Sequence, residues 1–373
     1  PFAIDTYLPA FHMLSEDLLA SPEAIQQTLT FYLLPYTLML LFHGPISDGI
    51  GRIKTMQWGL LLFFFASIGC ALSTTIESLW FFRALQGIGG GAGSVVARAM
   101  VRDLYEGAEA QRVMATVQIL FGIAPAIAPM IGGLLLGFHW QGIFIFLALY
   151  AAVSIYMGSK ILPETMTKNM LVPITFTGII ERYKSLLINK EFILLILSVS
   201  ANFSAFFIYV LASPVFLIDH LGFTAQQFGY LFIPTVSGML IGSFISKKTA
   251  GVIKPSSVLK FGYYFMFCIA LSNLLFCSFM PDNAFFNIGF IALYNIGMAS
   301  VMPIISLAGL DCFPKIRGTA ASGQAFTQML FASATAGILV PIVWFSTFGL
   351  SLGLFFLISF GLFTITKTNL WNK

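Results

Sequence analysis

The stretch Gly44-Pro-Ile-Ser-Asp48-Gly-Ile-Gly51-Arg52-Ile-Lys54 is a short polar turn that joins two long apolar runs. The run before it covers 24–46, and the run after it covers 54–75. Each run is long enough to cross roughly 30 Å of hydrocarbon as an α-helix, which rises about 1.5 Å per residue. We therefore expect this stretch to lie where the chain leaves a membrane and turns back into it.

Apolar runs of similar length continue along the rest of the chain. They cover 78–100, 111–136, 141–161, 192–214, 225–246, 257–279, 284–309, 319–343 and 347–366. A shorter apolar stretch ends near Met13, and we expect it to be a first helix that is truncated in this sequence. All these segments must be helices, because hydrocarbon offers no hydrogen-bond partner to an open strand edge. The sequence therefore predicts an all-α polytopic membrane protein with twelve transmembrane helices.

Composition excludes several other classes of protein. Only 9% of the residues are charged, 58% are hydrophobic and the mean hydropathy is +0.90, whereas a water-soluble domain of 373 residues needs much more polar surface. The four cysteines lie in or beside apolar runs, without the spacing of a metal site. Walker, zinc-binding and nucleophile-elbow motifs are also missing from the sequence. We therefore expect no enzyme, no cofactor, no metal, and no nucleotide or nucleic-acid partner.

The cations are sorted along the chain. Every Lys and Arg except Arg83 lies in every second gap between apolar runs or within a few residues of its edge, and the alternate gaps hold acids such as Glu16 and Glu77 without cations. Lys and Arg accumulate in the cytoplasmic loops of membrane proteins. The pattern therefore predicts a multi-pass protein, and the even number of spans places both natural termini in the cytoplasm.

The longest polar gap divides the predicted helices into two sets of six. It covers 162–190 and separates an N-terminal six-helix bundle at 1–161 from a C-terminal six-helix bundle at 191–373. Apolar residues recur at helical spacing within the gap, which favours a helix at the cytoplasmic membrane interface; a solvated linker is the alternative. A weak repeat supports two halves, because a small residue and then a cationic turn follow Gly242 as they follow Gly44.

Two charged side chains fall inside predicted helices of the N-terminal half. Asp5 lies ~12 Å from the outer end of the first helix, and Arg83 lies ~8 Å from the outer end of the fourth. The similar depths allow them to meet, and a carboxylate near a cation in the membrane can take up and release a proton. We expect proton coupling at Asp5 and Arg83, with a static ion pair that only fixes helix packing as the alternative.

The turn at 44–54 holds a second candidate site. Its glycines permit two helices to approach closely, and its carboxylate and guanidinium can pair with each other or cap a helix. We expect a cytoplasmic gate formed by Gly44, Asp48, Gly51 and Arg52, with an ordinary positively charged loop as the alternative.

Other polar or helix-bending residues lie within the apolar runs. We expect the substrate cavity to be lined by Tyr7, Tyr32, Tyr36 and Gln86, with core or lipid-interface aromatics as the alternative. The hinge of the fifth predicted helix is expected at Pro125, Pro129, Gly132 and Gly133, with a static kink as the alternative. The glycine-rich string at 87–93 lies within a helix and not after a strand, so it predicts close helix packing and not a nucleotide loop.

These motifs together resemble a known family. The stretch 44–54 resembles the signature between the second and third helices of the major facilitator superfamily, and Arg83-Ala-Leu-Gln86-Gly87 resembles the fourth-helix motif of its drug:proton antiporters. Pro125, Pro129, Gly132 and Gly133 are similar to the fifth-helix antiporter motif, although its usual Gly-Pro pair is Ala128-Pro129 here. Ile4-Asp5-Thr-Tyr7-Leu-Pro9 and Gly318-Thr-Ala-Ala-Ser322-Gly323 are similar to the Bcr/CflA (bicyclomycin/chloramphenicol resistance) subfamily.

The resemblance covers the whole chain and implies a function. It implies two six-helix bundles that rock about a central cavity and export small, mostly lipophilic compounds such as antibiotics across the bacterial inner membrane in exchange for protons. Asp5 would be the protonation site and Arg83 its polar partner, and Asp48 with Arg52 would hold a cytoplasmic latch. The implied partners are a small-molecule substrate, protons and the lipid bilayer, with the proton gradient as the energy source and a monomer as the working unit. A dedicated metabolite or siderophore exporter, an uptake symporter, and a non-transporting sensor or scaffold are the alternatives.

Overall fold

The computed structural model describes residues 2–137, 139–213, 215–223, 227, 229–279 and 283–372. All the regular structure of these residues is helical, apart from one isolated bridge between Ala250 and Ile253. The chain divides into two compact units. Unit 1 contains Pro1–Leu104, Ala124–Lys184 and Phe313–Phe326, and unit 2 contains Tyr105–Ile123, Ser185–Cys312 and Thr327–Lys373.

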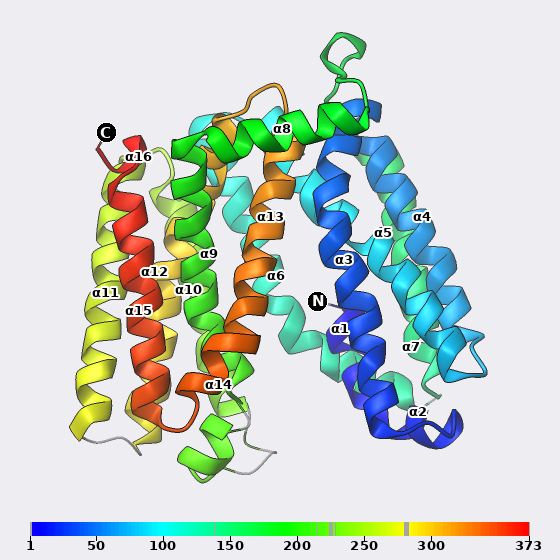
Figure 1. The fold of residues 1–373 in the computed structure, drawn as a ribbon, viewed down its shortest axis with the longest axis horizontal. Helices are drawn as coiled ribbons and strands as arrows, with labels where there is room; N and C mark the ends of the chain where they lie inside the picture. The colour runs from blue at the N-terminus through cyan, green and yellow to red at the C-terminus, as the bar shows by residue number, and fades with distance from the viewer. Residues whose placement is uncertain are drawn as a thin grey trace. The chain divides into compact units, whose positions relative to one another are not determined.

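Unit 1 begins with a broken helical segment and continues with long helices (Figure 1). The segment consists of α1 (Phe2–Asp5), the 3-10 turn η1 (Leu8–Ala10) and α2 (Phe11–Asp17). The long helices are α3 (Pro22–Ile50), α4 (Arg52–Ala71), α5 (Ile76–Leu104), the C-terminal part of α6 (Gly107–Leu136) and α7 (Gln141–Ile161). The linker contributes η2 (Lys168–Met170) and most of α8 (Phe176–Ile188), and α13 (Arg317–Ala334) contributes its first turns.

Helix α5 is central to unit 1, because it packs along both α3 and α4. This packing depends on glycine. A Cβ at Gly87 would lie 2.2 Å from the Tyr32 carbonyl oxygen of α3, and a Cβ at Gly89 would lie 2.4 Å from the Gly59 carbonyl oxygen of α4. The glycine-rich string at 87–93 is therefore part of two helix interfaces, as small residues allow inside membranes.

Unit 2 contains the remaining helices. They are α9 (Lys190–Leu211), the π-helical turn η3 (Val215–His220), α10 (Gly229–Thr249), α11 (Pro255–Phe279), α12 (Ala284–Asp311), the later turns of α13, the π-helical turn η5 (Thr335–Leu339), α14 (Val340–Val343), α15 (Thr347–Thr366) and α16 (Asn369–Asn372). The N-terminal part of α6 also belongs here. Helix α12 packs on α9, α10 and α11, and α15 packs on α9 and α11.

Polar residues at the ends of the apolar runs determine where several helices start. Side-chain oxygens of four residues each accept a backbone N–H from the following turn; they are Ser21 before α3, Asn189 before α9, Asn283 before α12 and Ser346 before α15. Ser and Asn are preferred at this position because they satisfy donors that no helical carbonyl can reach. These helix starts therefore follow from local sequence.

Nine of the described helices are long and apolar enough to cross a membrane, and α6, counted as a bent pair, raises the number to ten. The other two of the twelve predicted spans are α5 and the first segment. Helix α5 has 29 residues but carries charged side chains, including Arg83 and Arg98, along its length. The first segment is broken after Asp5 into short pieces.

The predicted span at 319–343 corresponds to Arg317–Val343, but its helix is not regular throughout. Helix α13 ends at Ala334, and η5 and α14 complete the span. Pro341 lies in the first turn of α14. A proline has no N–H to donate to the preceding turn and its ring crowds that turn, which agrees with the π-helical turn directly before it.

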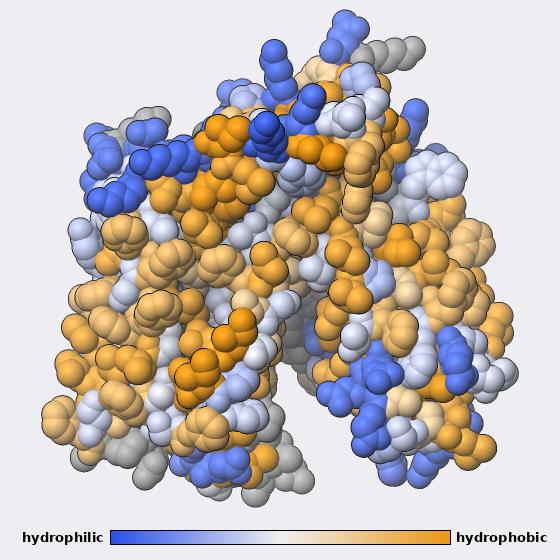
Figure 2. Space-filling model, viewed as in Figure 1, coloured by the Kyte–Doolittle hydropathy of each residue, from blue (hydrophilic) through white to orange (hydrophobic). Residues whose placement is uncertain are grey.

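The long helices present apolar side chains at their surface. Large exposed hydrophobic residues include Trp58, Phe65 and Tyr156 in unit 1 and Phe261 and Phe356 in unit 2. Figure 2 shows hydrophobic residues over the sides of the long helices and hydrophilic residues gathered near α8 and near helix ends. Such surfaces are stable against hydrocarbon and unstable in water, which agrees with helices that span a membrane.

Candidate functional site

Arg83 is fully buried in unit 1 and is held between two aromatic rings. Its guanidinium carbon lies 4.7 Å from the centre of the Tyr7 ring and 4.5 Å from the centre of the Tyr32 ring. Its Nη1 donates to the Ala3 carbonyl oxygen at 3.0 Å and to Gln86 Oε1 at 2.8 Å. Its Nε and Nη2 have no acceptor among the described residues. Cation–π attraction thus stabilises a desolvated guanidinium that retains unmet donors.

The four predicted cavity residues belong to the same cluster. Tyr7, Tyr32 and Gln86 contact Arg83 directly. Tyr36 stacks on Tyr32, with 5.9 Å between the ring centres. The structure therefore gathers all four around one buried cation, and their role in lining a substrate cavity stays a prediction.

Asp5 is the last residue of α1, on the segment that Arg83 contacts. It is half-buried, and it lies two residues after Ala3, whose carbonyl oxygen accepts the Arg83 hydrogen bond. Both side chains are described, and no hydrogen bond or ion pair joins them to each other; the Arg83 partners are Ala3 and Gln86. The pairing of Asp5 with Arg83 therefore stays a prediction, whereas the contact between their segments is observed.

Helix α6 runs beside the first segment at one of the predicted hinge residues. A Cβ at Gly132 would lie 2.2 Å from the Thr6 carbonyl oxygen, whereas a Cβ at Gly133 would meet nothing within 4 Å. Pro129 is exposed, and the side chain of Pro125 lies outside the described part of the structure. Gly132 is therefore a contact point between helices, and bending of α6 during transport stays a prediction.

The stretch 44–54 is almost entirely helical, so the loop between two helices is shorter than the sequence indicates. Helix α3 continues to Ile50 and α4 begins at Arg52, leaving Gly51 alone between them. Gly51 has a φ of +105°, which glycine adopts readily and other residues rarely adopt. One residue with this backbone conformation is enough to separate the two helices.

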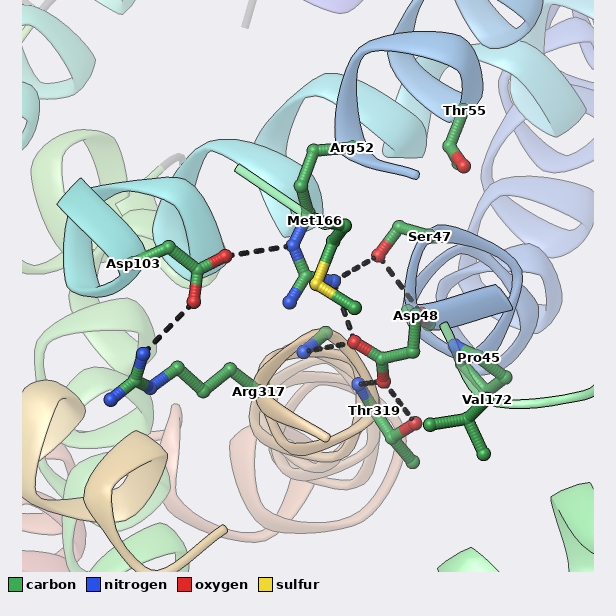
Figure 3. A network of polar contacts seen from close by, with 12 residues as sticks. Pro45, Ser47, Asp48, Arg52, Thr55, Asp103, Met166, Val172, Arg317 and Thr319 are labelled. Atoms are coloured by element: carbon green, nitrogen blue, oxygen red, sulfur yellow. Dashed lines mark hydrogen bonds and ion pairs between the residues drawn. The ribbon is translucent and has the colours of Figure 1, made fainter. Parts of the chain in front are cut away.

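Asp48 binds the start of α13, 270 residues further along the chain (Figure 3). Its Oδ1 accepts the Gly318 N–H at 3.0 Å, and its Oδ2 accepts the Thr319 N–H at 2.7 Å and the Thr319 hydroxyl at 2.6 Å. The first turn of a helix has unbonded N–H groups and a partial positive charge, so a carboxylate there is stabilising. Asp48 is thus a helix cap supplied from a distant part of the chain.

Arg52 and Arg317 connect two buried carboxylates in one chain of ion pairs (Figure 3). Arg52 Nη1 donates to Asp48 Oδ1 at 2.6 Å, and Arg52 Nε donates to Asp103 Oδ2 at 3.0 Å. Arg317, the first residue of α13, donates from Nη1 to Asp103 Oδ1 at 3.1 Å. Removal of one member would leave a buried charge without its partner, which is strongly unfavourable.

Two glycines allow α3 and α13 to approach this closely. A Cβ at Gly44 would lie 2.0 Å from the Gly318 carbonyl oxygen, and a Cβ at Gly318 would lie 2.6 Å from Asp48 Oδ1. The Gly44 N–H also donates to Ser322 Oγ at 2.8 Å. A side chain at either glycine would therefore push α13 away from Asp48.

Helix α8 lies against α3 near this network. The Tyr183 hydroxyl donates to the Leu41 carbonyl oxygen. Burial raises the pKa of the Tyr183 phenol, so the hydroxyl remains a donor at neutral pH. Three large apolar residues of α8, Phe176, Ile180 and Leu187, are exposed. The helix is amphipathic, and its position at a membrane interface stays a prediction.

Sequence reasoning identified the residues of 44–54 but missed their partners. The missed residues are Asp103, Glu164, Arg317, Thr319 and Ser322. The motif 318–323 contained a usable signal, because small and hydroxyl residues at a helix start admit a close neighbour and a cap. Asp103 and Glu164 carried no such signal, since each is an ordinary charged residue near a helix end.

The comparisons with known proteins agree with the motifs. A model of the Major Facilitator Superfamily matches residues 1–335. The chain is 30% identical over 327 residues to a bicyclomycin resistance protein homolog of Haemophilus influenzae, with 86% of this chain and 81% of the relative covered. It is 27% identical over 323 residues to multidrug resistance protein D of Escherichia coli, with 84% and 78% covered.

Solved structures show the same fold at low sequence identity. A bacterial homologue of the iron transporter ferroportin, in an outward-facing state, gives a TM-score of 0.75 at 13% identity and covers 98% of this chain and 97% of that chain. The human organic anion transporter MFSD10 gives a TM-score of 0.71 at 17% identity, with 96% and 88% covered. The family model, the relatives and the fold agree that this is a multi-pass membrane transporter of small molecules, related to drug-resistance exporters. The chain belongs to the Major Facilitator Superfamily.

Proposed function

We propose that this transporter exports small, mostly lipophilic compounds across the bacterial inner membrane in exchange for protons, with Asp5 as the protonation site and Arg83 as its polar partner. The observation that supports this most is the incomplete pairing of Arg83. Its Nε and Nη2 are buried without an acceptor among the described residues, while its Nη1 contacts the short helix that carries Asp5.

The ionisation of Asp5 can change the contacts of its segment. An ionised Asp5 is attracted to the unmet N–H groups of Arg83, whereas a protonated Asp5 is attracted much less. Asp5 is the last residue of α1, so a movement of this segment changes the distance between its carboxylate and Arg83. Proton uptake from outside then releases the segment, and proton loss to the cytoplasm draws it back. A solute that prefers one of the two arrangements is thereby exchanged for the proton.

In this proposal the Asp48 network is the latch that closes the cytoplasmic side. Its cations, Arg52 and Arg317, fall in gaps that the positive-inside rule assigns to the cytoplasm. The hydrogen bonds from Gly318 and Thr319 to Asp48 hold while the latch is closed and are lost when α13 moves away. Opening is therefore unfavourable unless solute or proton binding favours the open state.

Asp5→Asn tests the proposal. Inverted membrane vesicles with an imposed pH gradient are supplied with a panel of small lipophilic antibiotics, and the flux of each compound is measured. We expect Asp5→Asn to abolish the pH-driven flux, because the amide cannot exchange a proton, while the amount of folded protein in the membrane stays the same. Glu16→Gln, a change at an exposed acid of α2, is the control and keeps wild-type flux. Wild-type flux by Asp5→Asn would contradict the proposal.

The same vesicles separate the alternatives. Transport of metabolites but of no antibiotic would indicate a dedicated metabolite exporter. Flux in the same direction as the protons would indicate an uptake symporter. Absence of flux for every compound, with no effect of Asp5→Asn, would indicate a sensor or scaffold.

A further inference from the structure

The first turn of α4 has no cap from the residue that precedes it. That residue is Gly51, which has no side chain to accept a hydrogen bond. The first N–H groups of a helix cannot reach helical carbonyls and need other acceptors. Their acceptors matter here because α4 begins with Arg52, whose guanidinium bridges Asp48 and Asp103.

Glu164, 112 residues after Arg52, supplies these acceptors. Its Oε1 accepts the Arg52 N–H at 2.9 Å, and its Oε2 accepts the Ile53 N–H at 3.0 Å. The Met166 N–H donates to Oε1 at 3.0 Å and so holds the carboxylate in place; Figure 3 shows Met166 beside Arg52. A Cβ at Gly51 would lie 2.6 Å from Glu164 Oε2, so glycine is needed here for space as well as for its φ.

The residues that follow Glu164 contact the two acids of the network. Thr165 Oγ1 donates to Asp103 Oδ2 at 3.0 Å. The Val172 N–H donates to the Asp48 carbonyl oxygen at 2.9 Å. Segment 164–172, near the start of the linker, is therefore hydrogen-bonded to both acids that form ion pairs with the Arg52 guanidinium, Asp48 and Asp103.

Glu164 places a negative charge at the start of α4, as Asp48 does at the start of α13. The carboxylates of Asp48 and Asp103 pair with the guanidinium groups of Arg52 and Arg317, whereas Glu164 binds backbone N–H groups. The starts of α4 and α13 each add about half a positive elementary charge. Asp48 meets one of these helix starts and Glu164 meets the other, so the same chemistry is used twice in adjacent places.

We propose that Glu164 is a positioning residue of the latch: it caps α4 from the linker, sets the place of Arg52, and thereby favours the closed arrangement of Asp48 on α13. This rests on the proposed gating function of the Asp48 network. Glu164 and Arg52 both belong to the α3–α8 part of unit 1, so the cap does not depend on α13. The linker after α7 then takes part in gating and is more than a tether between helices.

A buried position in the first turn of α13 can report opening of the latch. Ala320 is fully buried there, so a cysteine at this position is protected while Asp48 holds α13. The native cysteines are first replaced by alanine or serine, and Ala320→Cys is then exposed to a membrane-impermeant maleimide in inverted vesicles. The rate of alkylation measures opening, and solute export is measured in the same vesicles.

The test compares Glu164→Ala and Glu164→Gln with Glu181→Gln, a change at an exposed acid of α8 in the same linker. We expect Glu164→Ala to raise the alkylation rate about 3- to 30-fold, the range that loss of a helix cap implies. Glu164→Gln should have a smaller effect, because one acceptor oxygen remains. Export should fall in the same order, and Glu181→Gln should change neither quantity. Glu164 is exposed, so these variants leave the packed core unchanged.

A double variant distinguishes positioning from general destabilisation. Asp48→Asn is expected to open the latch by itself, and Glu164→Gln added to it should raise alkylation little further, because the contact through which Glu164 acts is already lost. If the effects of Glu164→Gln and Asp48→Asn on alkylation were fully additive, the role of Glu164 would be overturned. It would also be overturned if the Glu164 variants had no effect and Asp48→Asn had one. Both outcomes would leave the gating function of the Asp48 network intact. No effect of Asp48→Asn would overturn the gating function as well.

Discussion

Arg52 and Arg83 are both buried in unit 1, but they are stabilised in different ways. Arg52 is bonded to the carboxylates of Asp48 and Asp103, so its charge is neutralised in this structure. Arg83 is stabilised by two aromatic rings, a carbonyl and an amide, none of which carries a full negative charge. A cation of the second kind can still attract a carboxylate, and this is why we propose Arg83, and not Arg52, as the partner of Asp5 in proton coupling.

We expect the ring of Tyr32, and not its hydroxyl, to stabilise the Arg83 guanidinium. We predict that Tyr32→Leu lowers the free energy of unfolding by about 2 kcal/mol, the value of a desolvated cation–π contact, and reduces transport. Tyr32→Phe keeps the ring and should leave both unchanged. Thermal unfolding in detergent and flux in vesicles measure the two effects.

A double-variant cycle provides the control for this prediction. In an Arg83→Met background the cation is absent, so Tyr32→Leu should cost less there than in the wild-type protein. An equal cost in both backgrounds would show that Tyr32 matters only through its volume.

At the scale of helices, glycine contacts determine which elements meet. Gly87 and Gly89 let α5 approach α3 and α4, and Gly44 with Gly318 lets α3 approach α13. In each case the nearest atom to an added Cβ is a carbonyl oxygen or part of the ion-pair network, which cannot shift without a movement of the backbone or loss of a bond. The positions of these helices are therefore sensitive to a single methyl group.

The neighbouring glycines of α6 offer a matched test of this sensitivity. We predict that Gly132→Ala lowers the unfolding free energy by about 1–3 kcal/mol and reduces transport, because the new Cβ would overlap the Thr6 carbonyl oxygen. Gly133→Ala should leave stability equal or slightly higher, since alanine favours a helix and nothing lies within 4 Å of its Cβ. Thermal unfolding measures the stability of both variants. Equal effects of the two substitutions would contradict the close contact of Gly132 with the Thr6 carbonyl oxygen.

The sequence predicts the positions of the helices better than it predicts the breaks within them. Eleven of the predicted apolar runs correspond to helices of the structure, and starts such as those of α3 and α9 follow from their caps. The breaks after Asp5 and after Ala334 were not predicted. Mean hydropathy over a run does not register a proline or a local side-chain hydrogen bond, so it cannot locate an interruption of a helix.

At the scale of the whole molecule, the sorted cations predict which loops face the cytoplasm. With the native cysteines replaced, Glu181→Cys in α8 should react with an impermeant maleimide only after intact cells are permeabilised, because its loop is rich in Lys and Arg. Glu16→Cys in α2 should react in intact cells, because its loop contains no cation. Both acids are exposed, so access to the reagent depends on the side of the membrane and not on burial. The reverse labelling pattern would show that each loop lies on the opposite side of the membrane from the one predicted. The proposed direction of transport would then be wrong.

The sequence by itself determined that this chain is a helical membrane protein of the Major Facilitator Superfamily, because apolar length, charge sorting and motif spacing are properties read along the chain. It also pointed to Asp5, Arg83, Asp48 and Arg52, because charge within or beside an apolar run is costly and therefore informative. Only the tertiary structure decided what these residues touch. Arg83 meets Ala3, Tyr7 and Tyr32, Asp48 caps a helix 270 residues away, and Glu164 caps another across 112 residues. Such contacts depend on how helices pack against one another, and their distances along the chain carry no local signal.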